Sequence, residues 1–111
     1  KSILGEYLAS RSIPQVSKAH PNFPNPFNPE TWMPYELATP SHVEISIYNT
    51  MGQLVRRLDL GHREAGVYLD RQSAAFWDGR SDNGEPVASG VYYYQIKAGD
   101  FAETRKMILR K

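Results

Sequence analysis

Apolar and polar residues alternate over 43–48, which is the pattern of a strand with one buried face. The next residues, 49–52, read Asn-Thr-Met-Gly and carry turn chemistry. A returning strand is predicted over 54–60. Val55 and Leu58 lie three positions apart in it, which breaks strict alternation and predicts a β-bulge.

Two strong strand patterns follow near the end of the chain, over 91–98 and 101–109. They are separated by Gly99-Asp100, a two-residue turn of the kind that closes a tight hairpin. Alternation then predicts one inward-facing set, which is Tyr92, Tyr94, Ile96, Met107 and Leu109.

Shorter strands are expected at 31–37, 66–68 and 74–77, and Pro34 within the first of them predicts an edge strand. Trp77 is interpreted as a core anchor whose indole N–H needs a partner. About seven short strands and no long helix predict an all-β, immunoglobulin-like antiparallel β-sandwich.

The first residues differ from the rest. We expect 1–20 to be a linker or short helical turn following an upstream region, and 21–111 to be the domain. Because Lys1 is not a natural start, the chain is expected to be a piece of a longer protein. Residues 21–29 hold four prolines, which forces an extended or turning segment. Its two aromatics, Phe23 and Phe27, are expected to plug one end of the sandwich.

Composition narrows the function. The net charge of +1, with mixed signs, gives no field that favours nucleic acid. No apolar run approaches the roughly 20 residues of a membrane span. There is no cysteine, hence no disulfide, thiolate chemistry or cysteine metal site. A basic cluster at 105–111 is interpreted as a solvated strand end. No cofactor is expected.

Five ordered motifs resemble the type IX secretion system C-terminal sorting domain (type A), and the related Ig-like domain of flagellar hook-capping proteins shares the pattern from the second motif onward. They are Pro24-Asn25-Pro26-Phe27-Asn28-Pro29, Tyr48-Asn49-Thr50-Met51-Gly52-Gln53-Leu54-Val55, Trp77-Asp78-Gly79-Arg80, Gly84-Glu85-Pro86-Val87-Ala88-Ser89-Gly90-Val91-Tyr92 and Thr104-Arg105-Lys106-Met107. The resemblance covers about residues 21–111.

The resemblance implies a non-catalytic module that closes the C-terminus of a larger exported bacterial protein. It implies an upstream cargo domain in the same chain and delivery through the periplasm to the medium or the cell surface. The implied partners are the outer-membrane secretion machinery or other proteins. The residues that it assigns to recognition and sorting are Pro24, Asn25, Pro26, Gly90, Tyr92, Lys106 and Lys111.

Two other functions stay open. The first is a hook-capping-like assembly or adhesion module that joins proteins edge to edge through an open strand. The second is a carbohydrate-binding module, in which an exposed aromatic strip stacks on sugar rings. That strip would consist of Trp32, Tyr35, Tyr48 and Tyr93.

Candidate chemistry is sparse. The three histidines are scattered without metal-ligand spacing, and no Ser–His–carboxylate set can be assembled, so no enzyme activity is expected. Asp78, Asp82 and Glu85 are the strongest candidates for cation ligands. Their spacing does not follow the EF-hand pattern, and a turn at Asp82-Asn83-Gly84 accounts for them, so no metal site is assigned.

Overall fold

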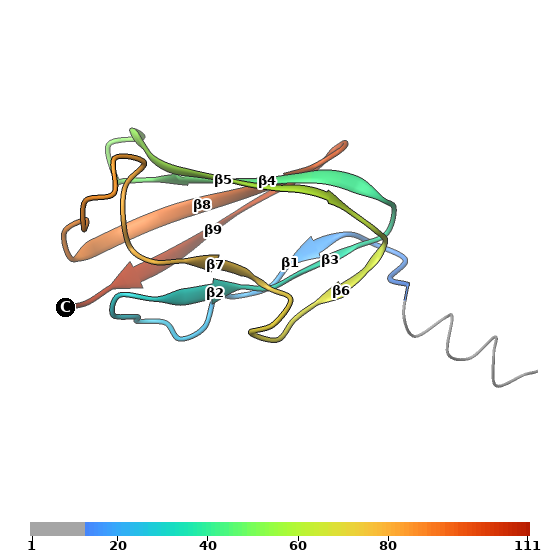
Figure 1. Ribbon diagram of the computed structural model, residues 1–111, viewed down its shortest axis with the longest axis horizontal. Coiled ribbons are helices and arrows are strands. Elements are labelled where there is room, and N and C mark those ends of the chain that lie inside the picture. Colours follow the sequence, from blue (N-terminus) through green and yellow to red (C-terminus); the bar gives the residue numbers. More distant parts are fainter. Residues whose placement is uncertain (1–12) are drawn as a thin grey trace, which may run out of the picture.

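The computed structural model describes residues 13–111 and shows two facing layers of antiparallel strands (Figure 1). All-β architecture of the immunoglobulin-like sandwich type is therefore confirmed. In chain order the strands are β1 (Lys18–Ala19), β2 (Thr31–Met33), β3 (Tyr35–Leu37), β4 (Ser41–Tyr48), β5 (Leu54–Arg63), β6 (Gly66–Tyr68), β7 (Ala75–Trp77), β8 (Gly90–Ala98) and β9 (Phe101–Leu109).

One layer is a four-stranded sheet in the order β5-β4-β8-β9. The predicted hairpin joins β8 to β9, with Ala98 paired to Phe101 across the turn. The predicted bulge in β5 is present at Val55, because Ile47 faces Arg56 while Tyr48 faces Leu54. A second register shift lies at Leu60, because Val43 faces Gly61 while Glu44 faces Asp59. Bulges of this kind increase the local twist of a strand.

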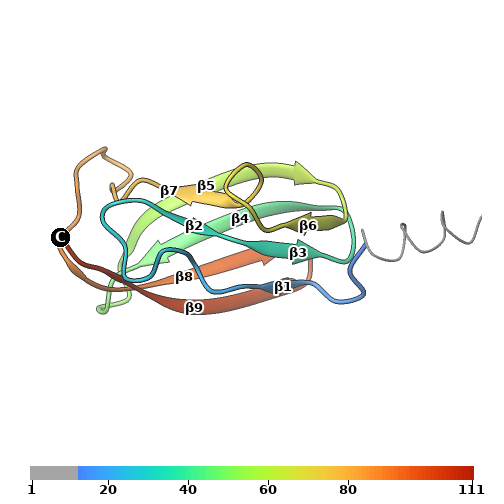
Figure 2. The same cartoon turned by 90° about the horizontal axis from the view of Figure 1, so that it is seen from below.

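The other layer consists of β1-β3-β6 and, next to it, β2-β7. It lies in front of the four-stranded sheet in Figure 2. The expectation of an edge strand at 31–37 is wrong. Pro34 instead divides this stretch into β2 and β3, and β3 lies between two neighbours. Proline is tolerated there because it sits at the break, where its carbonyl accepts a hydrogen bond from the His20 N–H (3.0 Å).

The core lies between the layers. Trp77 is fully buried, and its ring centroid lies 5.8 Å from that of Phe27 and 5.7 Å from that of Tyr92. As expected, the indole N–H has a partner, the Arg80 carbonyl at 2.9 Å. The other expected core residues Tyr94, Ile96, Met107 and Leu109 each expose at most 1% of their surface. The inward positions of β4 complete this core with Val43, Ile45 and Ile47.

Only one of the two phenylalanines in the proline-rich segment enters the core. Phe27 is 2% exposed, whereas Phe23 lies outside, with its ring stacked on Trp32 at 6.1 Å. The helical turn expected near the N-terminus lies outside the described residues. The boundary at residue 20 stays a prediction, and β1, just before it, pairs with β3. No helix within 13–111 has the length and apolar character of a membrane span.

Candidate functional site

The candidate recognition site lies at the end of the sandwich where the described chain reaches Lys111 (Figure 1). A segment that we call the strap, residues 21–29, crosses this end. Its own anchors are a reciprocal backbone pair between Phe23 and Trp32 (2.9 and 2.8 Å) and the bond from Asn22 Nδ2 to Thr31 Oγ1 (2.9 Å). The peptide bonds before Pro24, Pro26 and Pro29 are cis. The strap is thus held on β2 before it reaches β9.

The strap then binds the outer edge of β9. Asn25 Oδ1 accepts a hydrogen bond from the Ile108 N–H (3.0 Å). The Phe27 N–H donates to the Ile108 carbonyl, and the Arg110 N–H donates to the Phe27 carbonyl, both at 2.9 Å. Backbone groups that an edge strand would leave unpaired are therefore satisfied here. The first of the five motifs therefore binds the residues that directly follow the last one.

Loop 78–89 lies beside the strap at this end of the sandwich and contacts it. Gly79 has φ +78°, and a Cβ at this position would lie 2.7 Å from the Pro29 carbonyl oxygen. Only glycine fits both the backbone conformation and this close approach. At the end of the loop, Ser89 Oγ accepts a hydrogen bond from the Lys111 N–H (2.9 Å).

Arg56 on β5 binds three groups of the same loop. Its guanidinium lies 3.1 Å from Asp78 Oδ1 and 3.7 Å from Asp82 Oδ1, and it donates to the Arg80 carbonyl (3.0 Å). The two carboxylates considered as cation ligands therefore share an arginine. The turn at Asp82-Asn83-Gly84 is present, with Gly84 at φ +82°. Residues 13–111 contain no group of three or more His, Asp or Glu placed to hold a metal ion.

The structure brings most of the expected sorting residues to this end. Gly90 pairs with Leu109 and Tyr92 pairs with Met107, so both residues lie beside the C-terminal end of β9. Gly90 has φ +155°, a conformation that permits a sharp entry into β8. Tyr92 is buried, its hydroxyl donates to the Ala88 carbonyl (2.7 Å), and burial raises its pKa.

The two lysines differ from the buried members of this group. Lys106 and Lys111 are exposed, and Lys106 faces Tyr93 across the ladder on the outer side of the sheet. Tyr93 in turn faces Tyr48. The interpretation of 105–111 as a wholly solvated basic end is wrong for Arg105. Its guanidinium is partly buried, 2.9 Å from Glu103 Oε2, and it contacts the Ala19 carbonyl at 3.3 Å.

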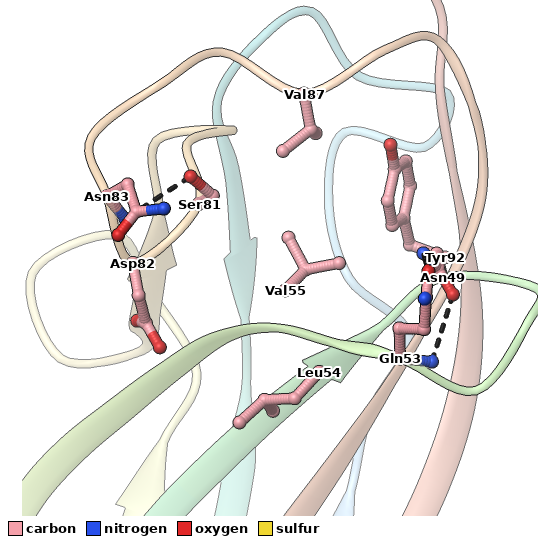
Figure 3. A pocket seen from close by; sticks show the side chains of 9 residues that line it. All are labelled: Asn49, Gln53, Leu54, Val55, Ser81, Asp82, Asn83, Val87 and Tyr92. Carbon is pink, nitrogen blue, oxygen red and sulfur yellow. Dashed lines mark hydrogen bonds between the residues drawn. The ribbon is translucent and has the colours of Figure 1, made fainter.

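A cleft of about 450 Å³ opens beside this end (Figure 3). The turn 49–53 forms one wall with Asn49 and Gln53, and loop residues 81–83 form the other. Val55 and Val87 lie between the two walls in Figure 3. The lining carries one carboxylate and one serine hydroxyl without a histidine or lysine, so it offers no nucleophile–base pair. Sequence reasoning missed this cleft because its two walls come from separate turns.

The aromatic strip considered for sugar binding does not form. Tyr35 is buried, with its ring stacked on Tyr68 at 4.8 Å, and burial raises its pKa. A different row lies on the outer face of β2 and β7, where Trp32 contacts Phe23 and, at 5.2 Å, Phe76. Phe23 and Trp32 are nearly parallel to each other, and Arg71 lies 4.5 Å over the Trp32 ring. The ring faces are thus already used within the chain.

The histidines are less scattered in space than in sequence. His42 and His62 face each other across β4 and β5. Each contacts a separate carboxylate, His42 with Asp59 at 2.7 Å and His62 with Glu64 at 3.0 Å. Their side chains are more than 60% exposed, so these are solvated polar contacts to separate carboxylates rather than a converging ligand set.

Solved structures share this fold at low sequence identity. Dimeric latent PorU from Porphyromonas gingivalis is 20% identical, with a TM-score of 0.64 over 85% of this chain and 9% of that one. PorZ from the same organism is 18% identical, with a TM-score of 0.52 over 86% of this chain and 11% of that one. FLGD from P. aeruginosa is 18% identical, with a TM-score of 0.52 over 87% of this chain and 63% of that one.

In each case this chain spans less than two thirds of the similar protein, and identity at this level shows the fold alone. A search of curated proteins finds no match. The model of the FlgD Ig-like domain family matches residues 30–100, which is more than half of the 111 residues. This chain therefore belongs to the FlgD Ig-like domain family.

Proposed function

We propose that the chain is a non-catalytic recognition module that closes the C-terminus of a larger exported bacterial protein. Its sorting surface is read by the outer-membrane secretion machinery, which delivers the cargo through the periplasm to the medium or the cell surface. The module is residues 21–111 together with β1, which pairs with β3, and the residues before β1 connect it to the cargo.

The observation that carries this proposal is the contact between the strap and the end of β9. Asn25 and Phe27 bind the backbone at Ile108 and Arg110, while Lys106 and Lys111 stay exposed. A rigid support beneath exposed cations is what a protein-reading site requires, because preordered groups lose less entropy on binding. PorZ, which shares the fold, is described as a surface component of the type IX secretion system.

The test is a reporter carrying the full chain at its C-terminus in a host with type IX secretion. Deleting 106–111 would also remove buried Met107 and Leu109, so charge reversal is the better change. We expect Lys106→Glu with Lys111→Glu to reduce surface delivery at least about tenfold, because reversed charges repel an acidic receptor. Lys97→Glu is the matched control, since Lys97 is exposed on β8 in the same sheet.

Unchanged delivery of a folded double variant would refute the sorting function. If Lys97→Glu reduces delivery equally, the effect reflects net charge rather than this site. The assembly function remains the alternative, and it predicts a chain that recruits other proteins while export is unaffected. The observation that favours it is the unpaired stretch of β9 described next.

A further inference from the structure

The strap covers only part of the outer edge of β9. Because the hairpin is closed by the pair Ala98–Phe101 around a two-residue turn, odd-numbered residues of β9 direct their backbone groups toward β8. Even-numbered residues direct theirs outward. Ile108 and Arg110 use these outward groups to bind the strap. The same parity places Ala102, Thr104 and Lys106 on the outer edge.

Those three residues form an open window in the edge. No hydrogen bond within 13–111 reaches their outward N–H or C=O groups, and β9 is the last strand of its sheet. The opposite edge of the sheet is also covered in part. On β5, the Val55 carbonyl accepts from the Asp82 N–H (2.9 Å), and the Arg57 N–H donates to Asp82 Oδ1 (3.1 Å). The window is therefore the part of the β9 edge whose outward backbone groups form no hydrogen bond within 13–111, and such groups can pair with another strand.

The sequence of the window is complementary to itself when reversed. Two antiparallel copies centred on Thr104 place Thr104 opposite Thr104, Ala102 opposite Lys106, and Glu103 opposite Arg105. Glu103 of each copy then faces Arg105 of the other on the same face of the sheet. The twofold symmetry makes two such pairs of opposite charge. Opposite charges in facing positions stabilise a strand pair, and like charges destabilise it.

Neighbouring registers are worse. A pairing centred on Lys106 opposes two lysines and places Thr104 against Ile108, where the strap already lies. A pairing centred on Ala102 places Thr104 against Asp100 in the turn, so fewer ladder positions remain. A pairing centred on Glu103 or Arg105 sets that charged side chain opposite its own copy, and a pairing centred between two residues sets outward groups against inward ones. Only the register on Thr104 uses all three open residues.

We propose that the Ala102–Lys106 window of β9 is a docking edge for a second copy of this chain. The two copies join their four-stranded sheets into one continuous sheet about a twofold axis at Thr104. The strap of each copy then lies opposite the Gly99-Asp100 turn of the other, where strand pairing ends. Glu103 and Arg105 are each about one third exposed and pair with each other. Glu103 Oε1 also accepts from the Ala19 N–H (2.8 Å) and Arg105 donates to the Ala19 carbonyl (3.3 Å), so the contact with the second copy is made in addition to these bonds to β1. This proposal does not depend on the sorting function.

A disulfide trap tests the register directly, because the natural chain has no cysteine. In the proposed pair, the two Thr104 Cα atoms are about 5.5 Å apart, within disulfide range. We expect full-length Thr104→Cys to form a dimer under mild oxidation. Ala102→Cys is the matched control, because its two copies are about 13 Å apart in this register and should stay largely uncrosslinked. Equal crosslinking of both, or none of either, overturns the proposal.

Sedimentation equilibrium of the full chain tests the interface without a covalent bond. Thr104→Pro removes an outward N–H but no bond of the β8–β9 ladder, so the fold should persist and dimerisation should weaken about tenfold or more. Thr104→Val retains the N–H and should dimerise like the natural chain. A natural chain that stays monomeric at millimolar concentration overturns the proposal.

Charge variants separate pairing from a mere structural role. Arg105→Glu and Glu103→Arg should each dimerise poorly alone, since each opposes like charges. A mixture of the two folded variants should form a heterodimer, because every facing pair is then complementary. Failure of the mixture to associate better than either variant alone contradicts the register. If Thr104→Pro impairs export of a chain that is always monomeric, the edge binds a strand of another protein instead.

Discussion

The side chain of Asn25 accepts a hydrogen bond from the backbone N–H of Ile108 at 3.0 Å, across 83 residues of sequence. This contact joins a proline-rich segment to the last strand. It also explains why an asparagine between two prolines is useful here. Proline fixes the path of the strap, and the amide oxygen supplies the acceptor that a neighbouring strand would otherwise provide.

Replacing Asn25 by Ala should lower the free energy of unfolding by about 1 kcal/mol, because the Ile108 N–H loses its partner. Asn25→Asp retains an oxygen acceptor and is the control, with a smaller loss expected. Urea denaturation followed by tryptophan fluorescence measures both. Equal stability of the alanine variant and the natural chain would show that solvent replaces this bond at no cost.

Gly79 is predicted to be more sensitive than Gly84, although both have positive φ, +78° and +82°. An alanine at 84 meets nothing within 4 Å and should cost about 1 kcal/mol of backbone strain. An alanine at 79 also meets the Pro29 carbonyl oxygen and should cost about 2 kcal/mol or more. The difference between the two variants in urea measures the contact with the strap. Equal losses would contradict that assignment.

Alkaline pH should destabilise the chain through Tyr94. Burial raises the pKa of this phenol to about 12, and its hydroxyl donates to the His20 carbonyl at 2.8 Å. A folded pKa above the unfolded value of about 10 contributes stability that is complete below pH 10 and is lost as pH rises toward 12.

The Tyr94 contribution to the pH dependence is about 2–3 kcal/mol. Measuring the urea midpoint from pH 8 to 12 should show this decline, and Tyr94→Phe should flatten part of it while costing about 1 kcal/mol at neutral pH. Tyr48→Phe is the control, because Tyr48 lies on the outer side of the sheet, where it faces Tyr93. If Tyr94→Phe keeps the full pH dependence of the natural chain, Tyr94 does not cause it. Tyr35 and Tyr92 would then be responsible, because burial also raises their pKa values.

Local patterning was sufficient to predict the strands that make the four-stranded sheet. Alternation over 43–48 and 91–98, together with the Gly99-Asp100 turn, specifies β4, β8 and the final hairpin, because side-chain direction in a strand follows directly from sequence parity. The same reasoning placed Trp77 in the core with a partner for its N–H, as found. It failed at Pro34, where a break within the sheet and an edge strand have the same local sequence.

The sequence alone therefore determined an all-β sandwich, its inward faces and the order of its motifs, since each depends on neighbours a few residues apart. Tertiary structure decided which distant segments meet: Asn25 with Ile108, Gly79 with Pro29, and Arg56 with Asp78 and Asp82. It also decided that Tyr35 is buried and that part of the β9 edge is open. Such contacts depend on how two layers are placed against each other, and no periodicity within one strand records that placement.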